Sequence, residues 1–95
     1  MPTYEAPGSF LRQYRNLSPE QRRAFQSALG KFVADLRSGS FRPGLRVRAV
    51  QGLPPGFFEM TWGPDGRAIF RFGPEAKPGE PHVIWYAIGT HTILP

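Results

Sequence analysis

The chain has 95 residues, carries a net charge of +5 and contains no cysteine. A chain of this length forms one domain with one main core, and its 40% of hydrophobic residues argues against intrinsic disorder. The absence of cysteine excludes disulfide and thiolate chemistry and suits a reducing cytoplasm. No apolar run is long enough to cross a membrane, and the N-terminal segment lacks the basic and apolar parts of a secretory leader. We therefore expect a single cytoplasmic domain over residues 1–95.

Two helices are predicted in the N-terminal part of the chain. Apolar side chains recur at helical spacing over residues 9–16, which indicates a short first helix. The segment Ser18–Gln21 then supplies a capping serine, a proline suited to the first helical position and a glutamine that completes a capping box. Apolar residues at helical spacing follow, and Gly39 can end the helix, so the second helix is expected over residues 19–37. The short link between the helices predicts an antiparallel pair.

Beyond the second helix the apolar period changes to two, which is typical of strands. Four strands are predicted, over residues 45–49, 57–62, 67–72 and 83–88. A tight hairpin turn at residues 63–66 joins the second strand to the third, and the other connections are also short. We therefore expect an α+β fold in which two N-terminal helices pack on one face of a four-stranded, mostly antiparallel sheet.

The alternation of the strands assigns one face of this sheet to the core. The residues expected on the inner face are Phe58, Met60, Trp62, Ala68, Phe70 and Phe72. The helical residues expected to pack against them are Phe25, Leu29, Phe32, Val33 and Leu36. Both sets follow from periodicity alone, two for a strand and 3.6 for a helix.

The opposite face of the predicted sheet is polar and basic. Ten of the twelve basic residues are arginine, whose guanidinium group binds phosphate through two parallel hydrogen bonds. Arg67 and Arg71 lie four residues apart on one strand, so both point to this face, about 13 Å from each other. No acidic residue occurs between Asp35 and Glu59. The residues expected on or beside this face are Glu59, Thr61, Arg67 and Arg71, with Arg46 and Arg48 on the first strand, and the same interval of sequence contains Arg37 and Arg42.

Two interpretations of the basic face remain open from the pattern. A concave basic face with aromatic residues nearby is typical of a cradle for single-stranded RNA. Alternatively, the face is solvated, and its arginines pair with glutamate and keep the protein soluble.

The two histidines occupy different positions. His82 follows Pro81 at the start of the last predicted strand, and we interpret it as a surface residue. His91 lies just past that strand, in the segment 89–91, where it is either a structural or a catalytic residue. Neither histidine has the cysteine partners or the helical spacing of a metal-ligand set, so no metal or cofactor is expected.

The predicted order of two helices and four strands resembles the RelE/ParE superfamily of bacterial toxins, which have a microbial RNase-like fold. The resemblance covers residues 9–93. It implies the toxin of a type II toxin–antitoxin system, which cleaves mRNA, often in the ribosomal A site, and is neutralised by a cognate antitoxin. The segments that carry it are Leu45-Arg46-Val47-Arg48 followed by Gly52, then Gly56-Phe57-Phe58-Glu59-Met60, Asp65-Gly66-Arg67-Ala68 and Ile88-Gly89-Thr90-His91.

The resemblance also assigns roles to residues. In the family, a basic residue follows the central hairpin and a histidine or tyrosine stands near the C-terminal end of the sheet, and Arg67 and His91 match these positions. Attack of a ribose 2′-OH on its own phosphate needs a base, a cation at the phosphate and an acid for the leaving oxygen. The chain offers Glu59 as base, Arg67 as clamp and His91 as acid or base. The residues expected to bind RNA are Arg42, Arg46, Arg48 and Arg71.

The chain departs from the family pattern at its C-terminal end. Many of the family nucleases end in a tyrosine-rich strand, whereas this sequence ends Ile93-Leu94-Pro95. Tyr86 lies on the last predicted strand and is a candidate for the core. Two other functions therefore stay open: a non-enzymatic inhibitor of a protein target such as DNA gyrase, as in the ParE branch, and an inactive RNA-binding module. The pairing of His91 with Arg67 favours the nuclease, because a pure binder needs no group that titrates near neutral pH.

Overall fold

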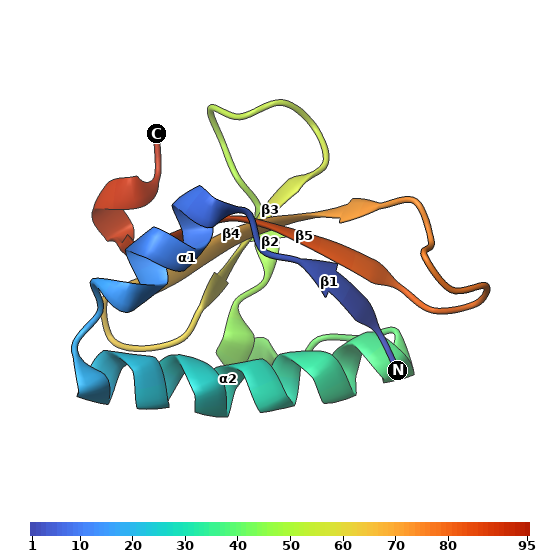
Figure 1. Ribbon diagram of the computed structural model, residues 1–95, viewed down its shortest axis with the longest axis horizontal. Coiled ribbons are helices and arrows are strands. Elements are labelled where there is room, and N and C mark those ends of the chain that lie inside the picture. Colours follow the sequence, from blue (N-terminus) through green and yellow to red (C-terminus); the bar gives the residue numbers. More distant parts are fainter.

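The computed structural model describes residues 1–95 as two helices packed against a mixed five-stranded sheet (Figure 1). The strand order is β1-β5-β4-β3-β2, with β1 parallel to β5 and the remaining neighbours antiparallel. The predicted α+β fold is confirmed, but the sheet has a fifth strand that was not predicted. The elements are β1 (Thr3–Glu5), α1 (Gly8–Arg15), α2 (Pro19–Ser38), β2 (Arg48–Ala49), β3 (Phe57–Thr61), β4 (Gly66–Gly73) and β5 (His82–Thr90), with 3₁₀ helices η1 (Pro43–Leu45) and η2 (His91–Ile93).

The additional strand β1 explains the position of His82. The hydroxyl of Thr3 lies 2.7 Å from Nδ1 of His82, and the carboxylate of Glu5 lies 2.8 Å from Nε2. His82 is only 8% exposed, so the prediction that it is a surface residue is wrong. A strand of three residues is too short to show an alternating pattern, and its partner lies at the other end of the chain. The histidine therefore fastens the N-terminal strand to the sheet.

The second helix begins and ends where the sequence predicts. The hydroxyl of Ser18 accepts a hydrogen bond from the Gln21 N–H, and the Gln21 side chain accepts one from the Ser18 N–H. Gly39 ends the helix in the left-handed conformation, at φ 81°. Arg22 joins the two helices, because its Nη1 donates to the carbonyls of Arg15 and Leu17 at 3.2 and 2.6 Å. As predicted, α1 and α2 run in roughly opposite directions (Figure 1).

The main core lies between the helices and one face of the sheet. Phe72 was assigned to this core but is 44% exposed, so its predicted burial is wrong. Its ring packs edge-on against Phe58 and Phe70 on the expected face, but near the end of the sheet, where burial stops. The other expected members are buried or packed against the core, including Phe25, Phe32, Met60, Trp62, Ala68 and Phe70.

A second, smaller apolar cluster occupies the opposite face of the sheet. Its buried centre is formed by Val50, Ile69 and Ala87. The segment between β2 and β3 and the C-terminal segment both lie on this side, away from α2 (Figure 1). The partly buried residues that pack on the centre are Leu53, Phe57, Ile93 and Leu94. The predicted open basic face is therefore apolar in its middle, and its charged groups lie around the cluster.

The first predicted strand is much shorter than residues 45–49. Leu45 ends the turn η1 and is buried, and Arg46 adopts a left-handed conformation at φ 49°. Only Arg48 and Ala49 pair with β3, opposite Glu59 and Phe58. The alternation of apolar residues over 45–49 therefore comes from a turn in which Leu45 is buried, and not from a strand of that length. None of the helices is both long and apolar enough to span a lipid bilayer.

Candidate active site

The hairpin between β3 and β4 is closed by a tryptophan that lies over a glycine. The Trp62 N–H donates to the Gly66 carbonyl at 3.1 Å, and the Gly66 N–H donates to the Gly63 carbonyl at 3.3 Å. A Cβ on Gly66 would come within 2.4 Å of the Trp62 ring, so no side chain fits at that position. The buried Trp62 ring thus holds the hairpin against the core, and Asp65 is exposed at the tip of the hairpin.

The C-terminal 3₁₀ helix is held against the sheet at another close contact. A Cβ on Gly89 would lie 2.8 Å from Cγ2 of Ile93, so only glycine lets η2 approach β5 this closely. Ile93 and Leu94 pack on the apolar cluster of the outer face. Since η2 begins at His91, this packing also fixes where the backbone of His91 stands.

His91 and Asp65 meet across these two segments. Nδ1 of His91 lies 2.5 Å from Oδ1 of Asp65, and both side chains are more than half exposed. A carboxylate on Nδ1 fixes the tautomer of the imidazole and leaves Nε2 free toward solvent. An ion pair as exposed as this one contributes little to stability. The arrangement instead suits a group that accepts or donates a proton at Nε2.

Arg67 lies at the same end of the sheet, two residues after Asp65. It pairs in register with Thr61 on one side and with Gly89 on the other, so it stands beside the strand end that leads to His91. Its Nη1 donates to the carbonyl of Gly66 at 2.9 Å, and its Nε is buried with no hydrogen-bond partner. No acidic side chain pairs with Arg67. Its charge is therefore not neutralised within the chain.

Glu59 and Arg48 form an ion pair at the β2–β3 edge of the outer face. Nε of Arg48 lies 3.1 Å from Oε1 of Glu59, and the two residues are register partners. Glu59 is 4% exposed, whereas the Arg48 side chain is largely exposed. The sequence placed both residues on this face, but it did not indicate that the carboxylate is buried and held by arginine. Of the two, only the Arg48 guanidinium is accessible to a ligand.

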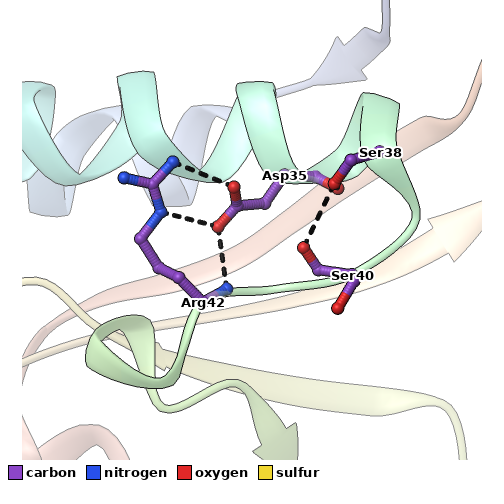
Figure 2. A network of polar contacts seen from close by, with 4 residues as sticks. All are labelled: Asp35, Ser38, Ser40 and Arg42. Carbon is purple, nitrogen blue, oxygen red and sulfur yellow. Dashed lines mark hydrogen bonds and ion pairs between the residues drawn. The ribbon is translucent and has the colours of Figure 1, made fainter.

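Arg42 is held by Asp35 from the last turns of α2. Figure 2 shows both oxygens of the carboxylate engaged: Nε and Nη2 of Arg42 donate at 2.8 and 2.9 Å, and its backbone N–H donates at 2.8 Å. These hydrogen bonds hold the pKa of Asp35 at about 2, below its ordinary value of 3.8. The same hydrogen bonds from Asp35 raise the pKa of Arg42. The pair fastens the segment after α2 to the helix, and Nη1 of Arg42 does not take part in it.

The other two predicted RNA-binding residues, Arg46 and Arg71, are exposed and form no ion pair. Arg46 lies in the segment between η1 and β2. Arg71 is the register partner of Phe57 and lies farther along β4 than Arg67. The predicted residues therefore form no single compact site. Arg67 and His91 lie together at one end of the sheet. Arg48 lies on the edge strand β2 and Arg71 farther along β4, whereas Arg42 and Arg46 lie outside the strands.

Asp65 is the member of this group that sequence reasoning missed. An aspartate in a hairpin turn is common for local reasons, because its side chain bonds the turn backbone. Its pairing with His91 spans 26 positions and depends on both the Trp62–Gly66 contact and the Gly89–Ile93 contact. No periodic pattern reports such a contact. The structure contains no group of three or more His, Cys, Asp or Glu side chains arranged to hold a metal ion.

The two helices, the mixed sheet and the short C-terminal turn form an α+β fold that solved structures of a toxin–antitoxin complex and of a toxin share. A chain of the Escherichia coli DinJ–YafQ toxin–antitoxin complex superposes on this protein with a TM-score of 0.71 and 14% sequence identity. The match covers 98% of this protein and 96% of the chain in the complex. A copper-bound mutant toxin from Helicobacter pylori has TM-score 0.64 and 18% identity, with both chains covered completely. No family model matches the sequence, and no curated protein does. The predicted resemblance to RelE/ParE toxins is thus confirmed in the fold.

Proposed function

We propose that this protein is the toxin of a toxin–antitoxin pair and that it cleaves mRNA without a metal ion, in the cytoplasm. The observation that carries the proposal is the His91–Asp65 pair beside the unneutralised Arg67. This combination supplies a proton-transfer group and a phosphate-binding cation at one end of the sheet. The likeness in fold to toxins supports the biological role.

In the proposed reaction the ribose 2′-oxygen attacks the adjacent phosphorus and the 5′-oxygen leaves. Arg67 binds the phosphate and offsets the charge that develops in the transition state. His91 acts through Nε2, where it either takes the proton of the 2′-OH or gives a proton to the leaving 5′-oxygen, and water takes up or supplies the other proton. Asp65 accepts the hydrogen bond of Nδ1 and thus keeps the imidazole in the required tautomer. The products are a 2′,3′-cyclic phosphate, or the 3′-phosphate derived from it, and a 5′-hydroxyl end.

Glu59 receives a different role from the one that the sequence indicated. Its carboxylate is buried and bonded to Arg48, so it is poorly placed to remove a proton from a ribose. We assign it to orienting Arg48, which contacts the RNA backbone together with Arg46 and Arg71. Arg42 adds a further cation, because Arg42 and Lys31 both line a cavity of about 470 Å³.

A cognate antitoxin is the expected partner, because one similar solved structure is a toxin–antitoxin complex. A groove of about 410 Å³ lies between α1, α2 and β1, and most of its lining is apolar. Leu11 and Tyr4 stand exposed at this groove. Six basic and two acidic residues lie on the two helices, so a partner that covers the groove is expected to be acidic.

The test is incubation of the purified protein with mRNA, with and without ribosomes, followed by analysis of the RNA ends. Cleavage that yields cyclic-phosphate or 3′-phosphate ends supports the proposal, and its dependence on ribosomes would show that the protein acts on ribosome-bound mRNA. A substrate with a 2′-methoxy group at the cut site should resist. Cleavage of that substrate at the normal rate contradicts the 2′-OH chemistry. Growth arrest on expression without RNA cleavage would instead favour an inhibitor of a protein target.

A further inference from the structure

A β-bulge in the last strand turns an aromatic side chain out of the sheet. The register pairs Ile69 with Ala87 and then Phe70 with Trp85, so Tyr86 has no opposite residue on β4. Trp85 lies in the core, whereas Tyr86 is 51% exposed. The candidate position of Tyr86 in the core is therefore wrong, because the bulge places its side chain on the outer face. Bulges are frequent beside functional sites, where they redirect a side chain.

Tyr86 does not stand alone on that face. Its ring centroid lies 5.2 Å from that of Phe57, and the rings are inclined at 72°. Phe57 is on β3 and Tyr86 on β5, so the two rings meet across the intervening strand β4. Phe57 is partly buried on the apolar cluster and thus supports the more exposed tyrosine. The contact fixes the ring of Tyr86 and leaves about half of the residue open to solvent.

A cation lies next to this aromatic pair. Arg71 is the register partner of both Phe57 and Ile84, it is exposed, and no acidic side chain pairs with it. It shares its strand face with Arg67, four residues earlier, at a distance of roughly 13 Å along β4. A nucleic acid strand of a few nucleotides spans that distance. An exposed aromatic ring with an adjacent arginine is the combination that binds single-stranded nucleic acid, because every base offers a flat face to the ring and every linkage a phosphate to the cation.

We infer that Tyr86, supported by Phe57 and flanked by Arg71, is a base-stacking subsite for single-stranded RNA. This inference rests on the proposed ribonuclease function and extends it along the outer face. A base a few nucleotides from the scissile phosphate stacks on Tyr86, and Arg71 holds a neighbouring phosphate. Since the ring contacts only the flat face of the base, the subsite adds affinity with little sequence preference.

The experiment measures binding separately from cleavage. A fluorescent RNA oligonucleotide with 2′-methoxy groups throughout is titrated with the wild-type protein, Tyr86→Leu and Tyr86→Phe, and the affinity is obtained from anisotropy. Tyr86→Leu should bind roughly 10- to 100-fold more weakly, because the stacked base is lost. Tyr86→Phe keeps the ring and should bind within about twofold of wild type. Phe72→Leu removes another exposed aromatic ring, near the end of β4, and should not change the affinity.

Thermal unfolding of each variant checks that the fold is intact. Oligonucleotides with one abasic position, moved along the strand, should show a single position at which wild type and Tyr86→Leu bind alike. Equal affinity of Tyr86→Leu and wild type for the intact oligonucleotide overturns the subsite but leaves the proposed nuclease standing. No binding of the oligonucleotide by the wild-type protein, either alone or in the presence of ribosomes, overturns both. Unchanged RNA affinity with loss of co-purification of a partner protein would make this patch a protein interface and also overturn the inference.

Discussion

The two faces of the sheet are built in different ways. The inner face is covered by α1 and α2, and its side chains come from long periodic segments of sequence. The outer face is covered by the loop between β2 and β3 and by the C-terminal turn. The residues of the candidate site lie around the apolar cluster that these segments form with the sheet. The inner face therefore contributes most of the stability, whereas the outer face carries the residues of the proposed site. Variants that affect one property without the other test this division.

The largest effect is expected for His91, the proposed proton-transfer group beside the outer face. His91→Ala should lower the cleavage rate by about 10²–10⁴ and remove one limb of the pH–rate profile. RNA affinity and thermal stability should stay close to those of wild type, because His91 is exposed and contributes no core contact. Single-turnover cleavage measured across a pH series provides the test. If His91→Ala cleaves RNA at the wild-type rate, His91 has a structural role and takes no part in proton transfer.

On the inner face the expected effect is on folding. Phe32 is 1% exposed and packs against the rings of Phe41, Phe70 and Trp85. Phe32→Ala should lower the free energy of unfolding by about 3–5 kcal/mol, measured by urea denaturation. The folded fraction should still cleave RNA at the wild-type rate. A cost below about 1 kcal/mol would contradict the assignment of Phe32 to the core.

The difference between the faces also explains how much the sequence could predict. Ser18, Gln21 and Gly39 determine the ends of α2 locally, so this helix was predicted almost to the residue. Arg67 was placed on the outer face by strand parity, which is also a local property. By contrast, the ion pair of His91 and the burial of Glu59 depend on contacts between segments distant in sequence. No local pattern encodes such contacts.

Arg67 should act on both binding and catalysis, because a phosphate contact serves both. Arg67→Ala should lower the cleavage rate by about 10²–10³. It should also weaken RNA binding and reduce the slope of log affinity against log salt by about 0.7, the value for one phosphate contact with a single strand. The measurement is anisotropy titration of an uncleavable oligonucleotide over a range of salt concentrations. An unchanged salt slope would show that Arg67 does not contact a phosphate.

A smaller loss of cleavage activity is expected when the contact between β5 and η2, which positions His91, is altered. In Gly89→Ala the new methyl group would lie 2.8 Å from Ile93, so η2 must move and displace His91. Cleavage should fall roughly 10- to 100-fold, since small displacements of a catalytic group are costly. The matched control is Gly30→Ala in α2, where an added Cβ meets nothing within 4 Å. That variant should keep its activity and gain about 0.5–1 kcal/mol of stability. Equal activity of the two variants would contradict the positioning role of Gly89.

The smallest effect is expected at the ion pair that fastens the end of α2. Arg42 holds the pKa of Asp35 at about 2 in the folded protein, whereas the carboxyl has its ordinary value of 3.8 when the chain is unfolded. The contribution of the pair to stability is therefore fully present above about pH 4 and is lost as the pH falls toward 2. The Arg42 side chain is 45% exposed, so solvent screening keeps this contribution modest.

Urea midpoints measured from pH 6 down to pH 2 for wild type and Asp35→Asn isolate the contribution of this pair, because the variant has no carboxylate to protonate at position 35. The midpoint of the wild type should fall more steeply than that of the variant below about pH 4, and the two curves should run parallel above it. Glu20→Gln, on the exposed start of α2, corrects for the change in net charge. Parallel curves for wild type and Asp35→Asn over the whole range would mean that the Asp35–Arg42 pair does not stabilise the fold.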